Sequence, residues 1–261
     1  VFIGCGVAIR REVFVGLGGY DATFGYCAEE YDLSGRMILD GLRVVFEPGL
    51  CVEHRKVSAG RDMDLILHRL VRNNAWVMER CAPQEVPRGE IREIRRRYRS
   101  IATKERALAG YGRGLVELRR TIGGQARRAM SAAEFARFTG LHAARQALEA
   151  ALGPGLGGSE GARAGRRVDT AAIIEPGKNE GVVRRALEER GVRVLESADA
   201  VRCADVGVIG TMSPGPMIDA ALRHAGEIEA GQVVVPWTGA LRAVRRARAP
   251  AGAGLGPLRA A

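Results

Sequence analysis

The stretch YCAEEYDLSGRMILDGLRVVFEPGLCVEH, residues 26–54, combines an acidic cluster with a helix signal, a strand signal and a closing histidine. The helix signal starts at the EE pair: Leu33 and Met37 lie four residues apart on one apolar face, and Gly41 marks the end of the helix. The LRVVFEP run that follows is typical of a strand that stops at Pro48. This stretch therefore predicts α/β structure.

The acidic cluster consists of Glu29, Glu30 and Asp32, all in the first turn of the predicted helix. One carboxylate there interacts favourably with the helix dipole, by about 0.3–1 kcal/mol when it is exposed. Three acids exceed what that role requires, and their mutual repulsion raises the proton affinity of whichever is least solvated. Glu30 lies on a different side of the helix from the apolar face, so we expect it to project into a cleft and to suit general-base chemistry.

Further local signals surround this stretch. GCGVAIRREVF, residues 4–14, predicts a strand running into a helix, and LGGYD, residues 17–21, predicts a turn in which glycine supplies positive φ and Asp21 caps the next segment. DMDLILHRLVRNNAWVMER, residues 62–80, has a helical period and precedes two prolines. We expect Trp76 on this helix to pack in the core.

The remainder of the chain alternates strand and helix signals. VDTAAII, VRVL, DVGVIG and QVVVPW predict strands, and NEGVVRRALEERG and PMIDAALRHAG predict helices, as in a small parallel Rossmann-like sheet. Gly177 and Gly181 follow the first of these strands but lack the spacing of a dinucleotide fingerprint. We therefore expect a docking or regulatory unit without catalysis. The predicted boundaries are an α/β segment over 1–64, a helical region over 65–152, a flexible glycine-rich linker over 153–167, the Rossmann-like domain over 168–241 and a disordered basic tail over 242–261.

Composition limits the classes of protein to consider. The formal net charge is +10, and residues 85–145 hold 15 Lys or Arg against 6 Asp or Glu. Such a region suits solvated helix faces or contact with an anionic surface. The five cysteines are too widely spaced for a C-x-x-C site and odd in number, which predicts a reducing, cytoplasmic compartment. No apolar run is long enough for a membrane span, and no export signal is visible.

Several of these motifs, in the same order, resemble the acceptor-side half of family 2 glycosyltransferases of the GT-A fold. They are the Gly-rich strand, RRE, GGYD, the acidic pair, DLSGR, GLRVVFEP, the closing His and the RN of RNNAWVMER, all within residues 1–80. The resemblance implies an inverting enzyme that transfers a hexosyl or deoxyhexosyl group from a nucleotide sugar to a glycan or lipid-linked acceptor during polysaccharide or glycoconjugate synthesis. It also implies a donor-binding half with a D-x-D motif before Val1, so we expect the fragment alone to be inactive.

The resemblance assigns roles to particular residues. Glu30 occupies the position of the catalytic base, which is usually Asp, while Glu29 and Asp32 would support the acceptor or the helix start. His54 matches a position that contributes to the metal or diphosphate site, for Mg²⁺ or Mn²⁺ whose other ligands are expected mostly in the donor-binding half. Arg10 and Arg11 are candidates for contact with donor phosphate or acceptor, with an exposed charge pair as the alternative.

Two other classes of function remain open. The Rossmann-like unit could be a nicotinamide-binding oxidoreductase module, although its glycine pattern is broken. The basic region could dock on an anionic membrane or on nucleic acid, although no nucleic-acid motif is present. We expect no nucleic-acid partner, and a cytoplasmic protein that associates peripherally with the inner face of the membrane.

Overall fold

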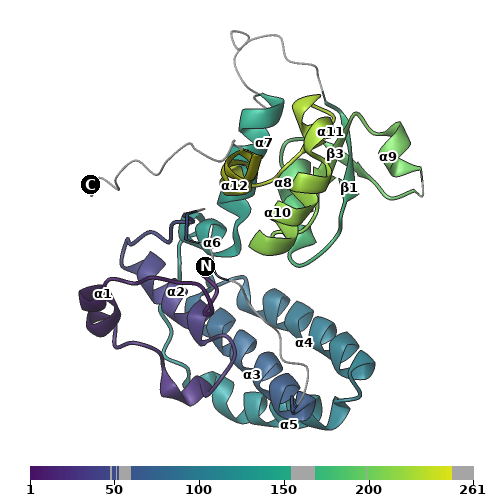
Figure 1. Ribbon diagram of the computed structural model, residues 1–261. Coiled ribbons are helices and arrows are strands. Elements are labelled where there is room, and N and C mark those ends of the chain that lie inside the picture. The colour runs from purple at the N-terminus through teal and green to yellow at the C-terminus, as the bar shows by residue number, and fades with distance from the viewer. Residues whose placement is uncertain (48, 51, 53–59, 154–167, 198, 249–261) are drawn as a thin grey trace. The chain divides into compact units, whose positions relative to one another are not determined.

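The computed structural model describes residues 1–47, 49–50, 52, 60–153, 168–197 and 199–248. The chain divides into two compact units, residues 1–45 with 50–139 and residues 46–49 with 140–261. Figure 1 shows the helices and strands of both. The protein is thus α/β in class, with its strands gathered in the second unit.

Helices form the regular structure of the first unit. In chain order they are α1 (Arg11–Gly16), the 3₁₀ turn η1 (Ala22–Phe24), α2 (Glu29–Leu39), α3 (Met63–Cys81), α4 (Pro87–Lys104), α5 (Leu108–Thr121), the 3₁₀ turn η2 (Ile122–Gly124) and α6 (Ala132–Thr139). The helices predicted from the acidic pair to Gly41 and over residues 62–80 are confirmed.

The two strands predicted in the first unit are wrong: no strand forms among its described residues. Residues 4–9 and 42–47 have no ladder partner, and without a neighbouring strand neither backbone pairing nor burial of one face is available to them. Most of their apolar side chains are exposed, Val45 to 74%, while Ile9 and Phe46 are half-buried. The sheet of a GT-A segment is therefore not formed by these residues.

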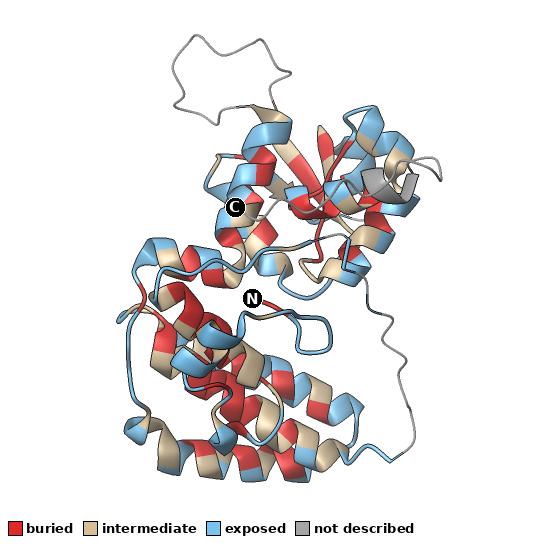
Figure 2. Cartoon of the chain, turned by 60° about the vertical axis from the view of Figure 1, so that its left-hand side comes forward, coloured by how far each residue is buried: buried red, intermediate tan, exposed pale blue. Residues whose placement is uncertain are grey.

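Helix α3 is the central element of the first unit and contacts α2, α4 and α5. It begins at the N-cap Asp62, whose carboxylate accepts a hydrogen bond from the backbone N–H of Leu65 at 3.0 Å. Its middle is buried from Val71 to Val77, and Trp76 is 5% exposed, which confirms its core position. In Figure 2 the buried residues, in red, line the facing sides of these helices.

Two glycines allow α5 to cross α3 at short range. A β-carbon on Gly110 would lie 1.9 Å from the carbonyl oxygen of Asp64, and one on Gly114 would lie 2.5 Å from that of His68. The Asp64 side chain adds a hydrogen bond across the same crossing, because it accepts from the N–H of Gly110 at 2.5 Å. This N–H is in the first turn of α5, where no helical partner is available.

The second unit contains a four-stranded parallel sheet in the order β2-β1-β3-β4. Its elements are β1 (Thr170–Ile174), α8 (Glu180–Glu188), β2 (Arg193–Leu195), α9 (Ala200–Cys203), β3 (Val206–Ile209), α10 (Pro214–Arg223), α11 (Ala225–Glu229), β4 (Val233–Val234) and α12 (Thr238–Arg248), with α7 (Leu141–Leu152) before them. All four strands were predicted, and so were α8 and α10, whereas α9, α11 and α12 were not.

The observed limits of the second unit are wider than the predicted ones. Helix α7 belongs to this unit because it packs against α8, and Arg145 pairs with Glu189 at 2.7 Å. Helix α12 continues to Arg248, so residues 242–248 are helical where a disordered tail was expected. Residues 154–167 of the predicted linker and 249–261 of the predicted tail lie outside the described residues.

The α3–α5 crossing yields a prediction. Gly114→Ala is expected to lower the free energy of unfolding by about 1–3 kcal/mol, because the added methyl group meets backbone and Val71 at 2.5 Å. Gly112→Ala is the matched control: it lies in the same helix with nothing within 4 Å and should raise stability by about 0.5–1 kcal/mol. Urea unfolding followed by Trp76 fluorescence, in a Trp237→Phe background, measures both. Equal effects would contradict the close crossing.

Candidate functional site

The loop before α2 sets the position of the acidic pair. It contains Gly18, Gly19 and Gly25 at positive φ, and then two residues in the left-handed region that are not glycine, Cys27 at φ 73° and Ala28 at φ 67°. Left-handed backbone costs a non-glycine residue about 1–2 kcal/mol. Other contacts must therefore hold this conformation immediately before α2.

Asn73 of α3 supplies those contacts. Its side-chain Nδ2 donates to the carbonyl oxygens of Phe24 at 3.0 Å, Tyr26 at 3.0 Å and Cys27 at 2.7 Å. Asn73 is itself 0% exposed, so a buried amide satisfies the loop carbonyls. One side chain thus gathers the backbone that leads into α2.

Arg72, the preceding residue, binds the same loop. Its Nη2 donates to the carbonyl oxygens of Thr23 at 3.2 Å and Phe24 at 3.3 Å, and its Nε donates to Oδ1 of Asn73 at 2.8 Å. The last bond orients the Asn73 amide so that its nitrogen faces the loop. Arg72 is held in turn by an ion pair with Glu117 at 2.6 Å.

A second group of charges fastens the start of the loop and α2. Asp32 is 2% exposed, and its two carboxylate oxygens pair with Arg80 and Arg36, each at 2.9 Å. Arg80 also pairs with Asp21 at 2.8 Å, while Arg36 donates to the carbonyl oxygens of residues 17 and 19. A buried carboxylate with both oxygens paired serves structure. Asp32 thus ties the start of α2 to Arg36 and to α3 through Arg80.

The acidic pair has a different environment. Glu29 and Glu30 are half-buried, and Oε2 of Glu29 is a buried oxygen without a hydrogen-bond partner in the described part of the chain. Burial first, and then the charges of Glu29 and Glu30, raise the pKa of Tyr20 and raise the pKa of Cys27 to about 11. The two carboxylates, a phenol and a thiol thus share one area at the start of α2.

The other predicted site residues are less informative. Arg10 and Arg11 are exposed at the start of α1, and neither forms an ion pair with any residue that the structure describes. His54 lies outside the described residues. Within the described ranges no group of three or more His, Cys, Asp or Glu could hold a metal ion. No described helix is long and apolar enough to cross a membrane.

Sequence reasoning did not identify Arg36, Arg72, Asn73 and Arg80 as parts of one network. A signal was available in the RNN run, because Arg72, Asn73 and Asn74 interrupt the apolar period of α3 at positions that would otherwise be core. All three side chains are buried. Buried polar groups require partners, so this run indicated a polar contact with another segment. Asp21 was expected to cap the next segment, which is confirmed by its bond from the Thr23 N–H at 2.9 Å.

The second unit places Gly177 against Thr211. A β-carbon on Gly177 would lie 2.7 Å from Cβ of Thr211, so this glycine permits close packing between the loops that follow β1 and β3. Ligands of parallel sheets bind above the carboxyl ends of strands where the connections diverge, which here is between β1 and β3. The Thr211 side chain occupies space at that point. Around Gly181, by contrast, the space that an added methyl group would take is open to 4 Å.

Comparisons with known proteins add no assignment: no family model matches the chain, and no curated protein or solved structure gives a significant match.

The Asn73 contacts yield a second prediction. Asn73→Ala removes the donor to three carbonyls and should lower the free energy of unfolding by about 2–4 kcal/mol, since each buried polar group left unpaired costs about 1–3 kcal/mol. Asn74→Ala is the control, because Asn74 donates only to Leu70 of its own helix and should lose about 1 kcal/mol. Urea unfolding gives both values, and a smaller loss for Asn73→Ala would contradict its role.

A third prediction concerns acid. Burial alone would raise the pKa of Asp21 and of Glu117, but hydrogen bonds and ion pairs, from Thr23 and Arg80 for the first and from His68 and Arg72 for the second, lower the pKa of both. A carboxylate with a lowered folded pKa stabilises the protein above its unfolded pKa, and this stabilisation is lost as pH falls through the folded pKa.

The free energy of unfolding should therefore decline as pH falls from about 4.5 downward, and Asp21→Asn should flatten part of that decline while lowering stability at pH 7. Glu85→Gln, at an exposed position, should leave the pH profile unchanged. Urea unfolding at a series of pH values measures the profiles, and an equally steep decline for Asp21→Asn would contradict the assignment.

Proposed function

We propose that this chain is the acceptor-binding and base-bearing part of an inverting glycosyltransferase that uses a nucleotide-sugar donor. The observation that carries the proposal is the network around α2. Motif residues on which the resemblance rests are distant in sequence and together fasten the loop and the start of the helix that carries the acidic pair; they are Asp21, Asp32, Arg36, Arg72 and Asn73. Motif residues that contact one another in the folded chain support the resemblance more strongly than motifs that only follow the same order in the sequence.

The distribution of charges inside the network supports a base at the acidic pair. Asp21 and Asp32 are neutralised by Arg80 and Arg36, and the acidic pair adds two further carboxylates at the same helix start. Exposed aromatic faces lie on the same loop, with Tyr20 39% and Tyr26 55% exposed. Amphipathic rings of this kind can contact a sugar while its hydroxyl groups remain hydrogen-bonded.

In the proposed reaction, a carboxylate oxygen of Glu30 takes the proton of an acceptor hydroxyl. The hydroxyl oxygen forms a bond to the anomeric carbon of the donor, and the bond from that carbon to the nucleoside diphosphate breaks, with inversion. Positioning and proton removal supply much of the rate. Glu29 would keep the local charge negative and raise the proton affinity of its neighbour.

The diphosphate leaving group requires neutralisation, for which Mg²⁺ or Mn²⁺ is suited. We place most ligands of that ion in the donor-binding half that the resemblance implies. The exposed apolar side chains of residues 1–7 and 42–52, including Val1, Val45 and Leu50, fit a chain whose sheet partners lie in that half. The substrates of the proposed reaction are a sugar nucleotide and a glycan or lipid-linked acceptor.

The test is Glu30→Gln in a protein that carries both this chain and the donor-binding half. Transfer should fall by about 10²–10⁴-fold, the usual contribution of a general base, while donor binding stays near normal. Glu12→Gln is the control, since Glu12 also lies in the first turn of a helix but outside the network. Turnover measured by product formation, with donor affinity by calorimetry, separates the two effects.

Glu29→Gln distinguishes the two members of the pair. If it removes transfer and Glu30→Gln does not, the base is Glu29, whose Oε2 lacks a hydrogen-bond partner among the described residues. If neither variant lowers the transfer rate, the proposed function is wrong.

A further inference from the structure

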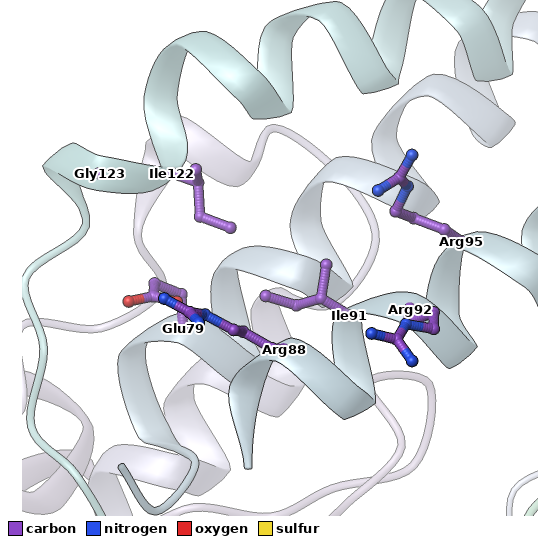
Figure 3. A pocket seen from close by; sticks show the side chains of 7 residues that line it. All are labelled: Glu79, Arg88, Ile91, Arg92, Arg95, Ile122 and Gly123. Atoms are coloured by element: carbon purple, nitrogen blue, oxygen red, sulfur yellow. The ribbon is translucent and has the colours of Figure 1, made fainter. Parts of the chain in front are cut away.

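The first unit contains a hollow that neither residue of the acidic pair lines. It measures about 380 Å³, and its lining comes from α3, α4 and the turn η2. The lining residues are Glu79, Arg88, Ile91, Arg92, Arg95, Ile122 and Gly123. Figure 3 shows Ile91 and Ile122 extending toward each other in the middle, with Glu79 and Arg88 at one end and Arg92 and Arg95 at the other.

The three arginines of the hollow have no partner among the residues that the structure describes. Across the part of the chain that the structure describes, the guanidinium groups of Arg88, Arg92 and Arg95 form neither an ion pair nor a hydrogen bond. Several arginines of the unit are compensated, as Arg96 is by Glu93 at 2.7 Å, while others such as Arg10 and Arg11 are exposed without an ion pair among the described residues. Like charges one turn apart destabilise a helix by about 0.2–0.5 kcal/mol per pair, so folding gains nothing from this arrangement.

One carboxylate also lines the hollow and would oppose an anion. Glu79 is paired with Arg127 at 3.8 Å, and Arg127 also donates to the carbonyl oxygens of Glu79 and Ala82. The charge of Glu79 is thus offset by an arginine that does not line the hollow. The remaining charge of the lining is that of three guanidinium groups.

Two features define the chemistry that fits. Planar guanidinium groups with several donors match the oxygens of a phosphate. The isoleucines between them offer apolar surface, which suits a hydrocarbon chain and gives nothing to a free phosphate ion. We infer that this hollow binds a phosphate ester whose organic part is apolar, with the phosphate at the end where Arg92 and Arg95 lie, the chain against Ile91 and Ile122, and Arg88 adding positive charge at the far end.

This chemistry occurs in a phosphorylated lipid headgroup and in a soluble alkyl phosphate. The site does not depend on transferase activity, because none of its residues belongs to the network around α2. The proposed site would give the basic helix α4 one specific ligand, rather than a non-specific attraction to negatively charged surfaces.

The experiment uses the 261-residue chain and three soluble probes, decyl phosphate, inorganic phosphate and decyl maltoside. Decyl phosphate should bind at least about tenfold more tightly than either of the others, since it alone meets both halves of the site. Equal binding of decyl phosphate and inorganic phosphate would overturn the apolar half of the inference, and equal binding of decyl maltoside would overturn the phosphate half.

Charge-matched variants separate a built site from general electrostatics. Arg88→Gln, Arg92→Gln and Arg95→Gln together should weaken decyl phosphate binding by at least about tenfold, because charge-assisted hydrogen bonds are lost. The control triple removes the same charge from exposed positions of α4 and α5 outside the hollow, and should change binding by less than about threefold. It consists of Arg99→Gln, Arg113→Gln and Arg119→Gln. An equal loss in both triples would overturn the inference.

Two more arms test the apolar contact and the source of the phosphate. Ile91→Ser should weaken decyl phosphate binding and leave the affinity for inorganic phosphate unchanged, and the opposite pattern would count against the site.

Phosphatidylcholine vesicles with phosphatidic acid should bind the chain more tightly than vesicles of matched surface charge with phosphatidylserine if the source is a membrane lipid. Decyl phosphate binding with no vesicle preference assigns the site to soluble phosphate esters. Gln has nearly the same helix propensity as Arg, so the substitutions should leave α4 and α5 helical. Circular dichroism of each variant checks that it is folded.

Discussion

The buried amide of Asn73 is the contact on which the acidic site depends. Its donation to three loop carbonyls allows Cys27 and Ala28 to remain in the left-handed region, from which α2 starts. A strained backbone persists only where surrounding contacts outweigh its cost. The direction in which Glu29 and Glu30 leave the helix therefore depends on a residue more than forty positions further along the chain.

The charges of the first unit divide into two sets by their surroundings. Asp21 and Asp32 are paired with arginines and hold the loop, whereas Glu29 and Glu30 lie at the helix start beside a phenol and a thiol whose pKa they raise. The arginines divide as well: Arg72 and Arg80 of α3 pair with acids or loop carbonyls, and those of α4 around the hollow have no partner among the described residues.

The two units are built on different principles. In the first, helices cross at glycines and polar side chains connect loop to helix, so little regular backbone pairing links distant segments. In the second, parallel strands and flanking helices follow the alternation of the sequence, and each strand has its neighbour within the same unit. The candidate chemistry lies in the first unit, where side chains and not a sheet determine the geometry.

The sequence by itself determined α2 and α3 of the first unit and the four strands with α8 and α10 of the second, because hydrophobic period, glycine and proline are local signals. It also identified the acidic pair and the capping role of Asp21. It failed for residues 4–9 and 42–47, since a strand exists only when another strand pairs with it. The joining of Arg72 and Asn73 to the loop, and of Arg80 to Asp21 and Asp32, was decided by tertiary structure alone, because no local pattern states which distant group satisfies a buried polar side chain.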